Sequence, residues 1–599
     1  MEHDDRHVMP GHAEPNPEQG ADRTGPGVLA EIPRVVDAVL LLVVGVLMLR
    51  LTWQGWADPL VDYGRELYVP WRLSEGQRLY TDIAWFNGPL AQHVNALWFR
   101  VFGAGAAVLG AANALVLAAT AWVLNRLVEP LSDRLTAWVA TAFFLVVFGF
   151  GQYVGISNYN WISPYSHEIT HGVALALACL AALATWQRTG APMWRALSGL
   201  ALGLCFLTKV EPFVAAAAAS VAMLVFSGPR GRRGLAPWLA AAAAPVGVSA
   251  IVFGVRGTLG AWPSVLSGEV AELPFYRAGM GLDRPGLRLE ETVMWAAIWF
   301  VALLVPVASA WLARETRSRL AAPISGGVTV LFLLGVRTLI PWTEALRPLQ
   351  LFVLLALGAL LAGRARDSDA EAPPESVALG VLGLALLSKM LLNVRVGHYG
   401  FALAAPAAVF TVVALARWLP DALDRRGMRG AVVRGAVLGL LAVFAFEHAR
   451  VTHSWMERKT EQLGSGVDAM RTDLRGAFVQ RAVDHVRAAG YRSIAVLPEG
   501  VMVNYLARTP NPTRYLNFMP PEEILFGDAA WEEAFRRAPP DAIVIVPKDT
   551  SEFGRGPFGI GYGTRLAAWI REEYAPAASL RIEGVNYAVQ ILVRRNSPT

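Results

Sequence analysis

Long apolar runs separated by short polar links dominate the first three quarters of the chain. Several of these runs, such as 35–51, 235–255 and 377–392, lie near the length that an α-helix needs to cross a bilayer. We therefore expect about 13 transmembrane helices. Their ranges are 34–54, 106–127, 135–153, 169–187, 196–209, 212–227, 236–256, 291–313, 321–342, 346–363, 377–392, 398–418 and 432–449. The pattern predicts a polytopic α-helical membrane protein.

The composition agrees with this pattern and excludes a soluble globular chain. Hydrophobic residues make up 54% of the 599 residues and charged residues only 17%. The two cysteines, Cys179 and Cys205, both fall inside apolar runs, so we expect neither a disulfide framework nor a zinc site.

Positive charge is concentrated in alternate links between the apolar runs. Every short link on one side carries at least two arginines, such as Arg126 with Arg134 and Arg188 with Arg195. Because cytoplasmic loops are rich in cations, this pattern predicts a cytoplasmic N-terminus in a cell inner (plasma) membrane. Residues 1–33 then form a disordered cytoplasmic tail. We interpret the net charge of +5 as a topology signal and expect no nucleic-acid partner.

The last 150 residues have a different pattern and lie on the outer side if the helix count is odd. We expect helices over 467–489 and 564–574 and strands over 493–497, 542–546 and 586–593. This alternation predicts an extracytoplasmic α/β domain over 450–599, following a membrane domain over 34–449. Its glycine-rich turns do not form a nucleotide-binding pattern.

The first outward loop, residues 55–105, contains two amphipathic segments that we expect to be helices on the membrane surface. In a helical conformation Asp62, Arg65 and Glu66 share one face. A carboxylate held there could accept a proton from an acceptor hydroxyl, which makes Asp62 a candidate catalytic base and Glu66 a second candidate. The alternative is a solvated acid paired with Arg65.

The second outward loop is rich in aromatic and hydrogen-bonding side chains that suit a sugar. Its candidate sugar or acceptor contacts are Tyr159, Trp161, Tyr165 and His167. Glu168 is a further candidate catalytic carboxylate or, together with His167 and His171, a metal ligand. The alternative is an interfacial aromatic belt with polar groups that cap helices.

Cations stand at the outward ends of several apolar runs. The candidates for binding a lipid phosphate are Lys209, Lys389, Arg395 and His398. Lysine is otherwise almost absent, since Lys459 and Lys548 are the only others in the chain. The alternative for each cation is that its side chain extends to the membrane surface without a specific ligand.

With these residues placed, the chain resembles the GT-C superfamily of integral-membrane glycosyltransferases, in particular the bacterial members of the family 39 branch of dolichyl-phosphate-mannose-protein mannosyltransferase-like enzymes. The resemblance covers roughly residues 34–400. It rests on Asp62 opening the first outward loop, on Gly76, Tyr80, Pro89-Leu90 and Phe102-Gly103, and on Gly203-Leu204 with Leu207-Thr208-Lys209.

The resemblance implies an enzyme that takes a sugar from a polyprenyl-phosphate carrier on the outer face and transfers it with inversion. It implies Asp62 as the base and Lys209, with Lys389, Arg395 and His398 by position, as contacts of the donor phosphate. Two motifs depart from the family. Tyr63 stands where the family usually has a second acid, and the Lys-Pro-Pro-Leu element is reduced to Gly88-Pro89-Leu90.

We therefore predict a GT-C-like glycosyltransferase that moves a monosaccharide from a polyprenyl-phosphate donor to a glycan, lipid or protein acceptor of the cell envelope. Its expected partners are that donor, that acceptor and membrane lipid, and no cofactor is expected, with a divalent metal as the less favoured alternative. The alternative functions are a transporter or flippase of a lipid-linked glycan and an inactive protein whose outer domain binds a glycan or protein. Transporters tend to have inverted repeats and helices broken near the midplane, whereas the unusual residues here gather at outward helix ends.

Overall fold

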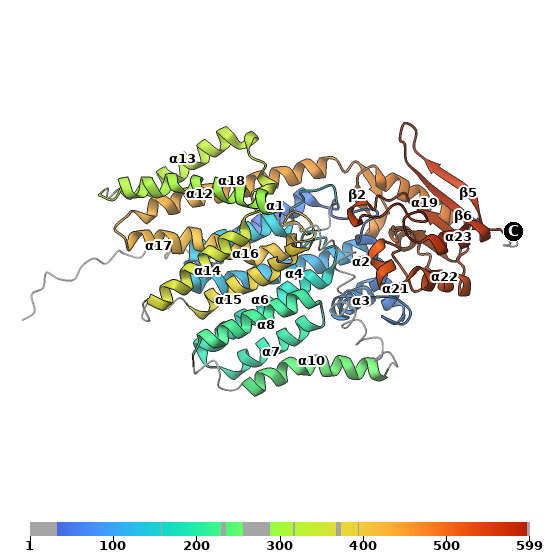
Figure 1. Cartoon of the computed structure of the whole chain (residues 1–599), viewed down its shortest axis with the longest axis horizontal. Helices are drawn as coiled ribbons and strands as arrows, with labels where there is room; N and C mark the ends of the chain where they lie inside the picture. The colour runs from blue at the N-terminus through green and yellow to red at the C-terminus, as the bar shows by residue number, and fades with distance from the viewer. Residues whose placement is uncertain are drawn as a thin grey trace, which may run out of the picture.

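The computed structural model describes residues 33–156, 159–228, 235–255, 288–315, 318–366, 373–392 and 394–595. A layer of long helices occupies one end of the molecule, and a smaller region of strands and short helices occupies the other (Figure 1). Nearly all of the predicted tail, residues 1–32, lies outside the described residues.

Each of the 13 predicted helical ranges overlaps a helix. The helices are α1 (Arg34–Thr52), α4 (Ala106–Val128), α5 (Arg134–Phe143), α6 (His167–Thr189), α7 (Pro192–Phe206), α8 (Val210–Phe226), α10 (Leu235–Val255), α12 (Leu289–Leu312), α13 (Ala321–Val336), α14 (Leu349–Arg366), α15 (Pro374–Leu387), α16 (Phe401–Val413) and α18 (Gly430–Glu457). The π-helical η3 (Phe144–Gly149) extends α5, while η8 (Ala414–Trp418) and α17 (Leu419–Asp424) extend α16. Within the described residues, nine helices are long and apolar enough to cross a membrane, and shorter apolar helices accompany them.

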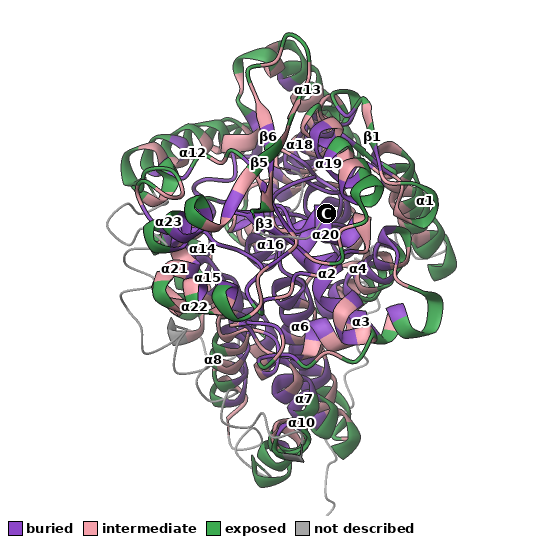
Figure 2. Cartoon of the chain, turned by 90° about the vertical axis from the view of Figure 1, so that its right-hand side faces the viewer, coloured by how far each residue is buried: buried purple, intermediate pink, exposed green. Residues whose placement is uncertain are grey.

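The outer helices expose many large apolar side chains, which would be unfavourable in water. On α1, α12 and α13, Leu42 is 64% exposed, Val305 67% and Leu331 73%. Seen from the end that carries the small strands, buried residues fill the middle of the molecule and exposed ones cover these outer helices (Figure 2). Because large exposed apolar surfaces are rare in soluble monomers, the helical region belongs to an integral membrane protein.

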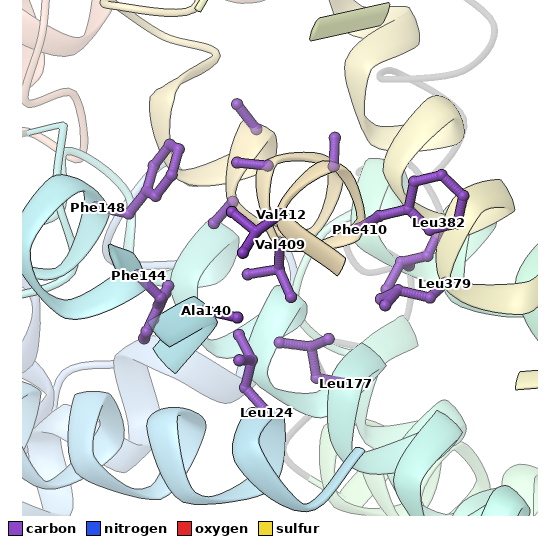
Figure 3. Close-up of a cluster of buried hydrophobic side chains, with 14 of the residues drawn as sticks. Leu124, Ala140, Phe144, Phe148, Leu177, Leu379, Leu382, Val409, Phe410 and Val412 are labelled. Carbon is purple, nitrogen blue, oxygen red and sulfur yellow. The ribbon is translucent and has the colours of Figure 1, made fainter. Parts of the chain in front are cut away.

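The core of the helical region joins helices that are distant in sequence. Leu124 of α4, Phe148 of η3, Leu177 of α6, Leu382 of α15 and Phe410 of α16 all contribute to one buried cluster (Figure 3). α15 and α16 approach so closely at Gly383 that an added Cβ would lie 2.9 Å from the Cα of Ala407, and the absence of a side chain there permits this approach. This packing fixes the ends of α6, α8 and α15 relative to one another.

The C-terminal region is an α/β unit, as the sequence predicts. Its elements are β1 (Glu461–Leu463), β2 (Met470–Thr472), α19 (Arg475–Ala489), β3 (Ile494–Leu497), α20 (Met502–Ala507), α21 (Pro520–Phe526), α22 (Asp528–Arg537), β4 (Ala542–Ile545), α23 (Thr564–Glu573), β5 (Tyr574–Arg581) and β6 (Ala588–Arg594). The larger sheet has the order β3-β4-β6-β5, in which β3 and β4 are parallel. The sequence missed β5, an edge strand with a bulge between Pro576 and Ala578 and few β-branched residues.

The first loop packs into the C-terminal region rather than beside it. Its two helices are α2 (Tyr63–Ser74) and α3 (Leu90–Phe102). α3 exposes an apolar face that includes Leu97 and Phe102, as a surface helix would. α2 differs from the expectation of a surface helix, because ten of its 12 residues are buried and it shares one hydrophobic core with α19 and α20. A Cβ at Gly64 would lie 2.5 Å from the backbone nitrogen of Met502.

Candidate active site between the helix ends and the C-terminal region

A cavity of about 140 Å³ lies where the helix ends meet the C-terminal region. The side chains around it come from four separate parts of the chain. They include Asp62, Arg65 and Asn87 from the first loop, Tyr165 and Ser166 before α6, Lys209, Glu211, Lys389 and Tyr399 from the helix ends, and Glu499, Glu522, Lys548 and Glu552 from the C-terminal region. Folding thus brings Asp62 together with Lys209 and Lys389, the residues that the sequence proposes for base and phosphate binding.

Asp62 occupies a strained backbone conformation at the start of α2. Its φ of 53° and ψ of −51° place it at the centre of a γ-turn, in which the Tyr63 N–H donates to the Val61 carbonyl at 2.5 Å. The Asp58 carboxylate holds the approach to this turn by accepting hydrogen bonds from the N–H groups of Leu60 and Val61. Such a conformation costs about 1–3 kcal/mol in a residue other than glycine, and residues of this kind are concentrated at functional sites.

The carboxyl group of Asp62 has few partners for a buried acid. Its Oδ1 accepts one hydrogen bond from the Arg65 guanidinium at 3.2 Å, and its Oδ2 is buried without a partner. Burial raises the pKa of Asp62 to about 7, although the Arg65 charge opposes this rise, and the negative charge of Glu499 adds to it. The group therefore changes protonation near neutral pH, as a general base should.

Lys209 and Lys389 flank a single carboxylate, Glu211. Lys209 is the residue before α8, and Lys389 lies in the 3₁₀ turn η7 (Ser388–Leu391) that ends α15. The Lys389 ammonium contacts Glu211 Oε1 at 2.6 Å, and Glu211 Oε2 is buried without a partner. Both ammonium groups act on this one carboxylate, so two positive charges stand on this side of the cavity.

Glu66, Glu168 and His167 lie behind the cavity rather than on its wall. All three are fully buried and belong to one hydrogen-bonded network. The Glu66 carboxyl meets His167 Nδ1 at 2.5 Å, and the Gln92 amide donates to both Glu66 and Glu168. Burial raises the pKa of Glu66 to about 7 against the opposing charge of Arg65. Of the three predicted catalytic carboxylates, the structure thus brings only Asp62 to the cavity.

The predicted sugar contacts are similarly divided. Tyr165 lines the cavity, whereas Trp161 is 1% exposed and packs against Phe144 in the helical core. The Tyr159 hydroxyl lies 2.9 Å from His398 Nε2. His398 itself lines a second cavity, of about 320 Å³.

The second cavity contains the remaining predicted phosphate contacts. Arg395 and His398 line it together with Arg347, and Glu552 lines both cavities. Burial lowers the pKa of His398 to about 4, and the charge of Arg395 acts in the same direction, so His398 is neutral at pH 7. The structure therefore separates Arg395 and His398 from the wall formed by Lys209 and Lys389.

The sequence did not identify the contribution of the C-terminal region to the cavity. Glu522 is 8% exposed, and burial raises its pKa to about 7 although the charge of Arg65 opposes the rise. Lys548 contacts Glu499 at 2.5 Å. The available signal was the rarity of lysine, since Lys548 is one of only four lysines in the chain.

The metal alternative finds no support in the part of the chain that the structure describes. Within it, no group of three or more His, Cys, Asp or Glu side chains could hold a metal ion. His167 and His171, which the sequence offered as ligands, have ring centroids 5.8 Å apart, and His167 is engaged by Glu66 and Asn113.

Comparison with known proteins gives distant structural likenesses only. No family model matches the chain, and no curated protein matches it. Solved structures do resemble it. One is ArnT from Cupriavidus metallidurans bound to undecaprenyl phosphate, with 13% identity, a TM-score of 0.48, and coverage of 94% of this chain and 98% of that chain.

The oligosaccharyltransferase of Archaeoglobus fulgidus is also similar. Its complex with Zn and sulfate has 12% identity and a TM-score of 0.48, covering 92% of this chain and 72% of that one. Its AglB complex with an inhibitory peptide and a dolichol-phosphate has 14% identity and a TM-score of 0.45, covering 94% and 74%. At these identities and TM-scores, no residue role passes from these proteins to this chain.

Proposed function

We propose that this protein is a glycosyltransferase that moves a monosaccharide from a polyprenyl-phosphate carrier to a hydroxyl of a cell-envelope acceptor. The observation that carries the proposal is the arrangement of the cavity. Its wall contains the buried carboxyl of Asp62, which has one oxygen without a hydrogen-bond partner. It also contains the two ammonium groups of Lys209 and Lys389. A transfer from a phosphate carrier needs both a proton acceptor and positive charge for the leaving phosphate.

The unpartnered polar atoms of the cavity suit a sugar. Three buried oxygens of residues in its wall have no hydrogen-bond partner, namely Asp62 Oδ2, Asn87 Oδ1 and Glu211 Oε2. All three oxygens are able to accept hydrogen bonds, and a buried acceptor that lacks a donor is energetically unfavourable. Sugar hydroxyls supply donors of this kind, and the ring of Tyr165 offers a surface for stacking. A ligand made only of phosphate would leave these oxygens unsatisfied.

The donor phosphate is best accommodated beside Lys209 and Lys389. A carrier phosphate there would share the two ammonium groups with Glu211. In this proposal Arg395 and His398 contact the carrier from the second cavity, because Glu552 borders both spaces. The resemblance to GT-C enzymes of family 39 implies the same donor class and a site on the outer face. The distribution of arginines between the links predicts a cytoplasmic N-terminus and, with an odd helix count, an extracytoplasmic C-terminal region.

The proposed mechanism is a single displacement. Ionised Asp62 accepts the proton of the acceptor hydroxyl through Oδ2 while the hydroxyl oxygen attacks the anomeric carbon. The bond between that carbon and the phosphate oxygen breaks, so the configuration is inverted, and the lipid phosphate departs with its negative charge near Lys209 and Lys389. Arg65 holds the other carboxylate oxygen, Oδ1, and leaves Oδ2 without a partner.

The transporter alternative receives less support. The cavity lies where α6, α8 and α15 begin or end, not midway along them, and the C-terminal region covers it. A path through the membrane would require sites near the middle of the helices.

The proposal is tested by an assay of sugar transfer with the purified protein in lipid. Each member of a panel of polyprenyl-phosphate monosaccharides is offered as donor, and its consumption is measured. Native membrane extract supplies the acceptors, and wild type is compared with Asp62→Asn. We expect one donor to be consumed and its consumption to disappear in the variant. Movement of labelled lipid between leaflets without consumption of any donor would instead support the transporter.

A further inference from the structure

The γ-turn that presents Asp62 is held from the C-terminal region. The backbone N–H of Asp62 donates to Glu499 Oε1 at 3.2 Å, across 437 positions of sequence. The other oxygen of Glu499 contacts the Lys548 ammonium at 2.5 Å. The N–H of a residue in a strained turn therefore has a charged acceptor, and that acceptor is itself fixed by a cation.

The sheet explains why these two residues meet at the turn. Glu499 follows β3 and Lys548 follows β4, and the two strands are parallel with Leu497 opposite Ile545. The pairing continues past the strands, because the Val546 N–H donates to the Leu497 carbonyl at 2.8 Å. The carboxyl ends of neighbouring parallel strands lie at one edge of a sheet, and here that edge faces the start of α2.

Further contacts keep this edge in place against the first loop. Arg475 of α19 contacts Asp58 at 2.8 Å, so the C-terminal region also supports the carboxylate that holds the approach to the turn. The Asn511 N–H donates to the Tyr68 hydroxyl at 2.9 Å. The Asp62 backbone is thus bound to the C-terminal region on both sides of the turn.

We propose that Glu499 and Lys548 are positioning residues for catalysis. They hold Asp62 in its γ-turn and so fix the position of its unpartnered carboxylate oxygen, Oδ2, relative to the substrates. The inference rests on the proposed function, in which Asp62 is the base. It gives the C-terminal region a part in the reaction itself. Glu499 acts through the backbone of Asp62 and need not touch either substrate.

The two residues also act on the Asp62 charge in opposite directions. The negative charge of Glu499 raises the pKa of Asp62, and the positive charge of Lys548 lowers it. Arg65 and Glu66 of α2 also act on the Asp62 charge, and Glu522 of α21, in the wall of the same cavity, is coupled to it by mutual repulsion. A role that was merely structural would not produce opposite effects when the two residues are replaced in turn.

Titration of Asp62 by infrared difference spectroscopy tests the inference without an identified donor. The carboxyl signal is assigned by subtracting Asp62→Asn from the parent spectrum at each pH. We expect Glu499→Gln, which keeps an oxygen for the Asp62 N–H, to move the midpoint to lower pH. Lys548→Met should move it to higher pH. The matched control is Glu532→Gln, which removes a charge that pairs with Arg536 and Arg565 on the far side of the C-terminal region and should leave the midpoint unchanged.

Turnover completes the test once a donor is known. Glu499→Ala removes the acceptor of the Asp62 N–H and should lower kcat roughly 10- to 100-fold with little change in KM, whereas Glu499→Gln should recover much of the loss. Folding of each variant is checked by its thermal midpoint in detergent. Folded variants whose midpoints and kcat match wild type would overturn the positioning role. If Asp62→Asn itself remains active, the base role in the proposed function fails, and with it the basis of this inference.

Discussion

Two aspartates at opposite ends of the helical region pair with arginine, yet they differ in nearly every other respect. Asp133, before α5, accepts from Arg434 at 2.7 and 2.8 Å, from Arg417 at 3.3 Å and from the N–H of Thr136 at 3.0 Å. Asp62 accepts from Arg65 alone through its side chain, and its second oxygen has no partner.

The number of donors and the depth of burial together explain the difference in charge state, since the side chain of Asp62 is 12% exposed and that of Asp133 27%. Burial raises the pKa of Asp133, but the Thr136 N–H and the two arginines outweigh it, so the pKa lies below its ordinary value. For Asp62 burial prevails and the pKa rises to about 7. A carboxylate with several donors holds the fold together, whereas one with a single donor can exchange a proton.

Substitution of the two aspartates should give the largest contrast. We expect Asp62→Asn to lower transfer by about 10²- to 10⁴-fold with the protein folded, because it removes the proton acceptor. Asp133→Asn should leave transfer nearly unchanged and lower stability by about 1 kcal/mol, since its ion pairs are partly exposed. Donor consumption and thermal midpoints measured on both variants decide the matter. Equal loss of activity in both would contradict the distinction.

The lysine wall gives the next largest effect. Lys389→Met should lower kcat/KM for the donor roughly 10- to 100-fold, because it removes one of two charges that stabilise the leaving phosphate and leaves Glu211 without its closest partner. Lys389→Arg should retain more activity than the methionine variant. Steady-state kinetics with the identified donor measure both. A methionine variant with unchanged kinetics would exclude Lys389 from the phosphate site.

The Asp62 carboxyl should act on activity and on stability with opposite dependences on pH. Transfer should fall about tenfold per unit below pH 7, because Asp62 becomes protonated. Its contribution to stability should change the other way. The pKa values of Asp62, Glu66 and Glu522 all rise to about 7 in the folded protein, so the folded state binds protons more tightly than the unfolded state. These three carboxyls therefore add stability as pH falls from about 8 towards 5, whereas His398, whose pKa is lowered to about 4, acts in the opposite direction over the same range.

The prediction is checked by measuring thermal midpoints from about pH 5 to 8 together with the pH profile of transfer, for wild type and Asp62→Asn. Asp62→Asn should weaken the pH dependence of stability, because it removes one of the three groups. The Asp133 contribution has the other sign and is lost only below the ordinary pKa of an aspartate, outside the range measured. A pH dependence of stability that is the same in wild type and Asp62→Asn would be evidence against a raised pKa of Asp62.

Substitution of Tyr165, whose ring lines the cavity, should give the smallest effect. The Tyr165 hydroxyl donates to the Tyr399 carbonyl at 3.3 Å, a long hydrogen bond, while its ring lines the cavity. We expect Tyr165→Phe to change KM by less than about threefold and Tyr165→Ala to raise it about 10-fold, since stacking depends on the ring. Steady-state kinetics separate the two variants. A larger effect of the phenylalanine variant would assign the hydroxyl itself to the ligand.

The helices could be predicted from the sequence, because hydropathy is a local property and each membrane span needs its own run of apolar residues. Local patterns also proposed Asp62, in an amphipathic loop segment, and Lys209 and Lys389, at the ends of apolar runs, and the structure places all three at one cavity. The same local reasoning selected Trp161 and His167 for the ligand. Aromatic rings serve a helical core as well as they serve a sugar, and only packing distinguishes the two uses.

Which charges meet could not be predicted from the sequence, because it depends on long-range packing. Glu499 and Lys548 reach Asp62 because two parallel strands end at one edge of a sheet and a hydrophobic core joins that sheet to α2. A contact across more than 400 positions leaves no periodic signal in the sequence. The protonation of Asp62 also depends on burial and on the count of nearby donors, and these are properties of the packed molecule.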